Sequence, residues 1–295
     1  MNKQKIIVTG GAGFIGTNFL YALQQKYKDA QLISLDIREP AYPVTGAVYK
    51  HCDVRDADNL SSILNGATKI FHLAAIIGTH ESVDSPYASF DTNVQGTVNI
   101  LEYGRLHDVE IFVAGMPGVW NNPYSISKDA AVRMALSYYE TYGIKVSVLR
   151  WFSVYGPYQY LERYNKAVPT FINRALQNQP IPIYGDGDQV ADFIFTSDAA
   201  FYAIGMLEKG QWGKVVQCAS GIGISANDLA ASIIELCGSS SEIEHLPMRK
   251  GEPPHSVIVA DTTELKEIFP EHTPVELREG LKQTIEYYRK YPPVD

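Results

Sequence analysis

Tyr124 and Lys128 are the two residues of this sequence whose types and spacing point most directly to chemistry. They stand four positions apart in the run YSISK, inside a segment predicted to be helical, so their side chains share one helix face. A phenol with a pKa of about 10 is a poor base at neutral pH, and a neighbouring ammonium stabilises its phenolate form. The pair could therefore take the proton of a substrate hydroxyl during an oxidation. The alternative is a tyrosine packed on a core face beside a solvated lysine, which is the commoner meaning of this spacing in isolation.

The run TGGAGFIG at Thr9–Gly16 predicts a binding turn for a dinucleotide. It follows an apolar, β-branched stretch, Lys5–Val8, and precedes a helix-like run, Thr17–Leu23. In such a turn the first glycine allows the tight bend, the second lets the backbone approach a pyrophosphate, and the third lets the helix pack on the strand. The diphosphate then binds free N–H groups at the positive end of the helix. The expected cofactor contacts in this run are Gly10, Gly13, Phe14, Ile15 and Gly16.

Asp36 indicates which dinucleotide is bound. It ends a second predicted strand, Leu32–Asp36, about twenty residues after the glycines. A carboxylate there accepts hydrogen bonds from a ribose diol and repels a 2′-phosphate, which favours NAD over NADP. Arg38 is the competing signal, because an arginine two residues further on can pair with a phosphate. In the alternative reading, Asp36 is a turn residue and Arg38 a solvated charge.

Composition excludes several classes of protein. The chain has 295 residues, 45% of them hydrophobic, which is enough to bury a full core and to form two domains. A formal charge of −8 argues against nucleic acid and anionic membranes as partners. No apolar run has transmembrane length, and because the first residues lead directly into the first predicted strand, we expect no signal peptide. Three scattered cysteines indicate reduced packing residues rather than a disulfide or metal framework, so we expect a cytoplasmic protein without a metal site.

The order of elements predicts an α/β fold. Strand-like and helix-like segments alternate through residue 150, which is the rhythm of a doubly wound parallel sheet (Rossmann). After Trp151, proline and glycine punctuate shorter elements. We expect a Rossmann domain at 1–152 and a smaller mixed α/β substrate domain at 153–295, with some segments of the second half returning to the first domain. The later strands are expected at Ala47–Lys50, Lys69–His72, Glu110–Val113 and Lys145–Leu149, and the crossover helices at Ala57–Leu64, Ser85–Leu106 and Pro123–Tyr142.

Taken together, these motifs resemble the extended short-chain dehydrogenase/reductase family, which includes nucleotide-sugar epimerases and dehydratases. The resemblance covers essentially the whole chain, and its specificity lies in the joint order of motifs that are individually weak. Besides the glycine run and the Tyr/Lys pair, the motifs are Asp53-Val54, Phe71–Ala75, Asn93–Thr97, Ser153–Pro157, Tyr184–Gly187 and Arg249–Glu252 ahead of Ala260-Asp261.

The resemblance implies an NAD-dependent enzyme that acts on a nucleoside diphosphate sugar. Its cofactor contacts would be Asp53 and Val54 at the adenine, together with Leu73, Ala74, Ala75, Asn93, Tyr124 and Lys128. Its substrate contacts would be Arg249 at the diphosphate, Tyr184 and Val168 near the base, Thr79 and Ser82 near the sugar, and Ser153. For Arg249 the alternative is a solvated charge, and for Tyr184 a packing role.

The sequence departs from the family's pattern mainly at residues expected near the reacting sugar. Met116 stands where a Ser or Thr usually shares the substrate proton, and a thioether cannot donate one. Pro117 and Gly118 stand where related 4,6-dehydratases have an Asp-Glu pair. Ser153 replaces a usual Asn, Ala191 replaces a frequent Arg, and the stretch from Trp120 to Tyr124 is short.

The leading hypothesis is a UDP-sugar 4-epimerase that works through a 4-keto intermediate. A second hypothesis is a dehydratase or reductase with atypical acid/base residues, such as His80, Glu81 or the loop around Met116. A third is an NAD-binding protein without turnover, serving as a sensor or subunit; the retention of both Tyr124 and Lys128 argues against it.

Each of the predicted helices Ser85–Leu106 and Pro123–Tyr142 carries a stripe of apolar residues at helical spacing: Val94, Val98 and Leu101 on the first, and Ala131, Met134 and Leu136 on the second. In proteins that this chain resembles, these two helices pair with their symmetry mates, so we expect a homodimer. The alternative is a monomer in which the chain's own sheet covers both stripes.

Overall fold

The chain forms two compact units, which alternate along the sequence. The computed structural model describes residues 4–118, 120–161 and 166–292. Unit 1 comprises residues 1–150 and 200–216, and unit 2 comprises residues 151–199 and 217–295. The chain therefore changes unit after residues 150, 199 and 216, and a segment of the second half belongs to the first unit.

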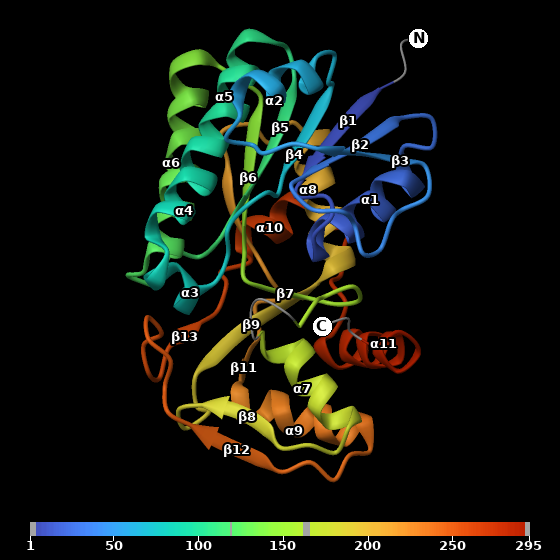
Figure 1. Ribbon diagram of the computed structural model, residues 1–295, viewed down its shortest axis with the longest axis vertical. Helices are drawn as coiled ribbons and strands as arrows, with labels where there is room; N and C mark the ends of the chain where they lie inside the picture. Colours follow the sequence, from blue (N-terminus) through green and yellow to red (C-terminus); the bar gives the residue numbers. More distant parts are fainter. Residues whose placement is uncertain (1–3, 119, 162–165, 293–295) are drawn as a thin grey trace. The chain divides into compact units, whose positions relative to one another are not determined.

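The centre of unit 1 is a seven-stranded sheet with the strand order β10-β6-β5-β4-β1-β2-β3 (Figure 1). Neighbouring strands among β1 to β6 all pair in parallel, so the predicted doubly wound sheet is confirmed. The order reverses between β1 and β4, and ligands of such sheets bind beyond the carboxyl ends of the strands at this point. The strands are β1 (Lys5–Thr9), β2 (Gln31–Asp36), β3 (Ala47–His51), β4 (Lys69–His72), β5 (Glu110–Gly115), β6 (Val146–Trp151) and β10 (Val215–Cys218).

Helices cover both faces of this sheet. In Figure 1, α2, α5 and α6 lie on one face, and α1 and α8 lie on the other. The predicted crossover helix Ser85–Leu106 is not one regular α-helix: a π-helical turn, η1, separates α4 from α5. The helices are α1 (Phe14–Lys26), α2 (Ala57–Leu64), α3 (Thr79–Asp84), α4 (Pro86–Phe90), η1 (Asp91–Gln95), α5 (Gly96–Leu106), α6 (Pro123–Tyr142) and α8 (Thr196–Glu208), the last of which enters unit 1 at Ala200.

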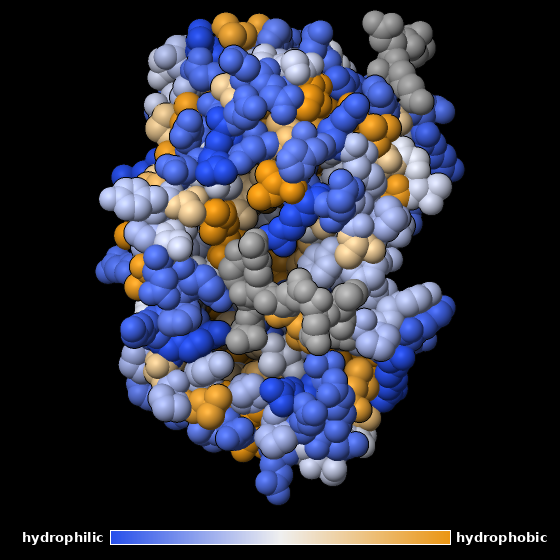
Figure 2. Space-filling view, in the orientation of Figure 1, coloured by the Kyte–Doolittle hydropathy of each residue, from blue (hydrophilic) through white to orange (hydrophobic). Residues whose placement is uncertain are grey.

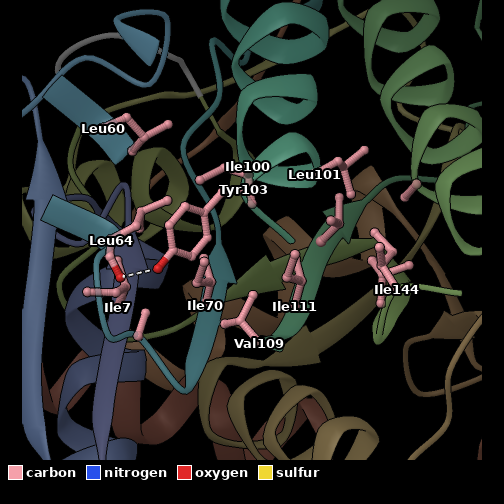
Figure 3. Packing of buried hydrophobic residues seen from close by; sticks show 14 of the residues in the cluster. Ile7, Leu60, Leu64, Ile70, Ile100, Leu101, Tyr103, Val109, Ile111 and Ile144 are labelled. Carbon is pink, nitrogen blue, oxygen red and sulfur yellow. Dashed lines mark hydrogen bonds between the residues drawn. The ribbon is translucent and has the colours of Figure 1, made fainter. Parts of the chain in front are cut away.

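The core of unit 1 holds the strand ends in place. Figure 3 shows isoleucines from β1, β4 and β5 packed against leucines of α2 and α5. Tyr103 of α5 lies among them and donates its hydroxyl to the carbonyl of Leu64 at 2.8 Å. On the opposite face Phe19 of α1 packs against Phe71 and Phe112, with ring centroids 5.7 and 6.4 Å away. With apolar side chains packed on both faces, the sheet is a rigid support for the loops at its carboxyl edge.

Unit 2 is smaller and mixed, as expected. Strand β9 (Val190–Phe195) pairs with β7 (Ser153–Tyr155), β11 (Gly223–Ser225) and β13 (Val257–Ile258), while β8 (Ile181–Tyr184) pairs with β12 (Ile243–Leu246). The buried carboxylate of Asp192 accepts hydrogen bonds from the backbone N–H groups of Ser220, Gly221 and Ala260, which ties β9 to two distant segments. Its helices are α7 (Ala167–Leu176), α9 (Ala226–Cys237), α10 (Thr263–Ile268) and α11 (Leu277–Lys290).

The face drawn in Figure 2 is mainly hydrophilic, and hydrophobic residues form small separate groups on it. No helix within the described residues is long and apolar enough to cross a bilayer.

Candidate active site

The glycine turn after β1 has a backbone that only glycine fits. Gly10 has a φ of +69°, and a Cβ on it would lie 2.8 Å from the backbone nitrogen of Ala74. A Cβ on Gly16 would lie 2.2 Å from the carbonyl oxygen of Gly10. The turn therefore lies directly against the chain that follows β4, and α1 lies directly against the turn.

The start of α1 forms a cradle for an anion. Gly13 is the N-cap residue, no side chain caps the helix, and a Cβ on Gly13 would meet only the Gly10 carbonyl oxygen, at 3.3 Å. The backbone here is open to a ligand, and the predicted contacts Phe14 and Ile15 are partly exposed beside it. First-turn N–H groups and the positive end of the helix dipole favour a diphosphate at such a site.

Asp36 lies beside this cradle at the end of β2. Its Oδ2 accepts a hydrogen bond from the N–H of Ala12, and its Oδ1 accepts one from the N–H of Arg38, both at 3.1 Å. Burial is the main influence on this carboxyl group and raises its pKa. Arg38 is exposed, and the charge of its guanidinium lowers the Asp36 pKa only to a minor extent. The carboxylate is therefore held at the glycine turn by backbone donors, whereas the guanidinium is not held there.

This arrangement predicts strong selectivity between the two dinucleotides. We expect NAD to bind more than tenfold tighter than NADP, a difference above about 1.4 kcal/mol. The reason is that the fixed Asp36 carboxylate accepts from a ribose diol and repels a 2′-phosphate. Calorimetric titration of both dinucleotides measures the ratio, and Asp36→Asn should reduce it. Equal affinities for the native protein would mean that Arg38 recruits the phosphate and that Asp36 is a turn residue.

Asp53 and Val54, the predicted adenine contacts, have different surroundings. Asp53 remains partly exposed. Arg55 Nε lies 3.0 Å from both Asp53 Oδ1 and Asp53 Oδ2, and this hydrogen bonding holds the pKa of the Asp53 carboxyl group below its usual range. Val54 is 4% exposed, and its carbonyl accepts a hydrogen bond from Asn99 Nδ2 at 2.8 Å. Asp53 therefore keeps a partly exposed carboxylate, whereas the Val54 side chain is buried, and their contacts with an adenine stay predictions.

A buried hydroxyl and imidazole network supports the segment after β4 that contains Leu73, Ala74 and Ala75. Thr9 Oγ1 accepts hydrogen bonds from the N–H groups of Leu73 and Ala74, both at 3.1 Å, so its own proton goes to His72 Nδ1 at 2.8 Å. Thr97 Oγ1 donates to the Asn93 carbonyl, so it accepts from His72 Nε2 at 3.0 Å.

Burial and the Lys128 charge lower the pKa of His72 to about 3, so the ring stays neutral. Sequence reasoning did not single out this network, because a Thr and a His in apolar strands carry no local signal.

Asn93 lies in the π-helical turn η1 and joins two elements of the site. Its Oδ1 accepts from the N–H of Ile76 at 2.8 Å, and its Nδ2 donates to the Ile76 carbonyl at 2.9 Å and to Ser127 Oγ at 3.0 Å. Both amide protons are thus donated within the protein, and the side chain is 1% exposed. A direct contact of the Asn93 side chain with the cofactor stays a prediction. Such a contact would have to use the second lone pair of Oδ1, because the other hydrogen-bonding positions of the amide are occupied.

Tyr124 and Lys128 lie in the first two turns of α6. Asn122 caps the helix by accepting from the N–H of Ser125 at 2.9 Å, and Pro123 opens it. Tyr124 is half-buried, and Lys128 is 5% exposed in unit 1. Burial lowers the pKa of the Lys128 ammonium to about 8. Because such a group still carries its proton at pH 7, it can stabilise a phenolate one helical turn away.

The loop between β5 and α6 offers no acid or base in its described first part. Met116 and Pro117 are half-buried and Gly118 is exposed with a φ of +61°. Val119 lies outside the described residues.

Thr79 and Ser82, expected near the sugar, are both buried in α3, where the Ser82 hydroxyl accepts a hydrogen bond from the backbone N–H of Tyr124 at 3.2 Å. His80 in the same helix has a buried Nδ1 without a hydrogen-bond partner among the described residues.

The predicted substrate residues of unit 2 form one pair and two separate positions. Arg249 stacks on Tyr184, with its guanidinium carbon 4.5 Å from the ring centroid, and Glu252 holds its Nε and Nη2 at 3.1 and 2.8 Å. Val168 is 2% exposed and its side chain packs in the core of unit 2, so a contact with the base stays a prediction. Ser153 pairs with Phe193 in the sheet. Within the described ranges, no group of three or more His, Cys, Asp or Glu residues could hold a metal.

Several proteins similar to this chain are named as enzymes of nucleotide sugars. A family model described as NAD dependent epimerase/dehydratase family matches residues 6–116 and 116–219. A UDP-N-acetyl-alpha-D-glucosaminuronate decarboxylase of Bacillus cytotoxicus is 28% identical and covers 98% of this chain and 98% of its own length. A dTDP-glucose 4,6-dehydratase of Streptomyces niveus is 29% identical, with coverages of 97% and 93%.

Among solved structures, the UDP-glucose 4-epimerase of Thermotoga maritima, crystallised with UDP-glucose, is similar with a TM-score of 0.91 at 28% identity, covering 97% of this chain and 99% of that one. The glycine cradle and the fixed Asp36 carboxylate fit the NAD that the family description names.

Proposed function

The chain belongs to the NAD dependent epimerase/dehydratase family, and we propose that it is a 4-epimerase of a UDP-sugar. An NAD-dependent enzyme that modifies a nucleotide sugar is what the family and the relatives covering nearly the whole chain support. Choosing among epimerase, dehydratase and decarboxylase requires the reacting residues themselves.

In the proposed reaction, Tyr124 takes the proton of the sugar's C4 hydroxyl. NAD, when bound, supplies the oxidant that accepts a hydride from C4 and gives it back. The Lys128 ammonium stabilises the Tyr124 phenolate, and its burial strengthens that effect because little water screens the charge. After the 4-keto sugar has turned its other face toward the cofactor, Tyr124 returns the proton and the C4 hydroxyl has the opposite configuration.

The observation that carries this choice is the chemistry of Met116–Gly118 after β5. These three side chains provide no hydroxyl, carboxyl or imidazole group. A 4,6-elimination needs a further acid and base beside the sugar, whereas inversion at C4 needs proton transfer at one oxygen only. Tyr124 is half-buried one helical turn before the buried Lys128, and this pair could perform that single transfer.

A product screen tests the proposal. The purified protein with NAD is incubated with UDP-, dTDP-, GDP- and CDP-sugars, and the sugar signals are followed by proton NMR. We expect a new C4 epimer from a UDP-sugar and no net change in NAD. A 6-deoxy-4-keto product would instead favour an elimination in which His80 or Glu81 takes part, and release of CO₂ from a uronate would favour decarboxylation. Tight NAD binding without any product would favour the sensor or subunit hypothesis.

Met116→Ser gives a second prediction about the same loop. In a 4-epimerase that lacks only a helper hydroxyl, a hydroxyl at this position should leave turnover unchanged or raise it, because it can share the C4 proton with Tyr124. Met116→Ala is the matched control, since it removes the thioether without adding a donor. The measurement is kcat together with the product by NMR. A fall in kcat or a new product with Met116→Ser alone would show that the thioether belongs to a pocket shaped for other chemistry.

We also propose a homodimer. The predicted stripes are partly used by the chain's own core, since Leu101 and Ala131 are fully buried. Apolar side chains nevertheless remain exposed on the adjoining helices α4 and α6, at Tyr87, Phe90 and Ile126. Light scattering at micromolar concentration should give twice the 32.7 kDa of one chain, and Phe90→Glu should lower that mass. A native mass near 33 kDa would contradict the dimer.

The three free cysteines, two of them buried, support the expected cytoplasmic location.

A further inference from the structure

Buried serine hydroxyls bind both peptide groups of Tyr124. The Tyr124 N–H donates to Ser82 Oγ at 3.2 Å, and the Tyr124 carbonyl accepts from Ser127 Oγ at 2.9 Å. Ser82 is 1% exposed and Ser127 is fully buried. Because both hydroxyls are shielded from water, water does not readily replace either hydrogen bond when it is lost.

Each serine is in turn attached to a different element of unit 1. Ser82 Oγ donates to the Thr79 carbonyl at 2.9 Å within α3. Ser127 Oγ accepts from Asn93 Nδ2 at 3.0 Å, and Asn93 lies in the π-helical turn η1. The backbone of Tyr124 is thus connected on one side to the helix after β4 and on the other side to the turn before α5.

This attachment matters because Tyr124 lies at the start of a helix. The first four N–H groups of an α-helix have no partner within the helix, and first turns fray unless other groups bind them. Asn122 satisfies the N–H of Ser125, and Ser82 satisfies that of Tyr124. A general base is useful only in a narrow geometry, and a displacement of about 1 Å can reduce the rate about 100-fold.

We propose that Ser82 and Ser127 are positioning residues, which fix the Tyr124 backbone and thereby the place of its phenol relative to Lys128, one helical turn further along α6. The proposal rests on Tyr124 being the base of the proposed function, and it gives Ser82 a role other than the sugar contact expected from the sequence. Ser125 provides a matched control on the same helix. It is also 1% exposed, but its hydroxyl has no hydrogen-bond partner among the described residues.

The first arm of the test needs no substrate. The protein is labelled with ¹³Cζ-tyrosine, saturated with NAD and titrated by NMR, and Tyr124→Phe identifies the Tyr124 signal. In Ser82→Ala and in Ser127→Ala we expect the Tyr124 titration midpoint to rise by at least about 0.5 pH unit, because a phenol farther from the ammonium ionises less readily. Ser125→Ala should leave the midpoint unchanged. Ser82→Cys and Ser127→Cys keep the side-chain size with a weaker hydrogen bond, so they should give smaller rises and remain measurable if an alanine variant unfolds.

The second arm uses the substrate found in the product screen. Ser82→Ala and Ser127→Ala should lower kcat by about 10-fold or more, with KM and the Kd of NAD changing less than about threefold, and Ser125→Ala should match the native enzyme. An unchanged midpoint in both the alanine and cysteine variants overturns the proposal. For Ser82, a higher KM with an unchanged kcat overturns it in favour of a sugar contact. Failure of the proposed function would look different. In that case Tyr124→Phe would retain full turnover, while the Ser82 and Ser127 variants would still shift the Tyr124 titration midpoint.

Discussion

Replacement of Tyr124 by Phe should lower turnover by about 10²- to 10⁴-fold, the usual contribution of a positioned general base. The ring and its packing stay in place, so only the hydroxyl that exchanges the C4 proton is removed. The affinity for NAD should change little, because the glycine cradle and Asp36 carry most of that binding. Steady-state kinetics and calorimetric NAD titration on the same preparation measure both quantities.

Tyr103→Phe is the matched control for this prediction. Its hydroxyl is also hydrogen-bonded, to the Leu64 carbonyl, but it lies in the core of unit 1 away from the cradle. We expect Tyr103→Phe to lower stability by about 1 kcal/mol and to leave turnover near the native value. Undiminished turnover in Tyr124→Phe would remove the Tyr/Lys mechanism and, with it, the assignment of the reaction to the sugar's C4.

A methyl group on Gly16 should impair both the fold and the binding of the cofactor. The added Cβ would lie 2.2 Å from the Gly10 carbonyl oxygen and 2.5 Å from Gly11 Cα, and these are backbone atoms that cannot rotate away. We expect Gly16→Ala to lower the free energy of unfolding by about 1–3 kcal/mol, the usual range for overpacking, and to lower NAD affinity by at least about tenfold. Denaturant unfolding and calorimetry measure the two effects.

Gly13→Ala separates these effects. A Cβ on Gly13 would meet only the Gly10 carbonyl oxygen, at 3.3 Å, so the apoprotein should unfold within about 1 kcal/mol of the native protein. NAD affinity should still fall, because the cradle that admits the diphosphate would be narrower. If both variants bound NAD with native affinity, the glycine turn would not be the cofactor site.

The parts of the site that sequence reasoning predicted are those with short-range signals. The glycine spacing, Asp36 at the end of a strand, and Tyr124 four residues before Lys128 are each recognisable within a few dozen residues. The sheet could be predicted because buried parallel strands are continuous apolar runs.

The rest depends on contacts between segments distant in sequence. Thr9, His72 and Thr97 meet only because β1, β4 and α5 pack together, and no local pattern marks any of them. Ser85–Leu106 was predicted as one helix because a π-helical turn changes the register by a single residue and needs no Gly or Pro to do so. The hydrogen bond between the Tyr124 N–H and the Ser82 hydroxyl joins two helices and has no local signal, while the sugar contact expected of Ser82 stays a prediction.

The strand order of unit 1 also has a consequence for synthesis on the ribosome. Strand β6 ends at Trp151, but its outer neighbour β10 begins only at Val215, after the chain has passed through a large part of unit 2. A nascent chain that has just completed β6 therefore exposes the unpaired edge of that strand, and such edges recruit other chains. Because the closing strand arrives more than sixty residues later, unit 1 is completed late, and truncation between Trp151 and Val215 should give an aggregating product rather than a soluble half.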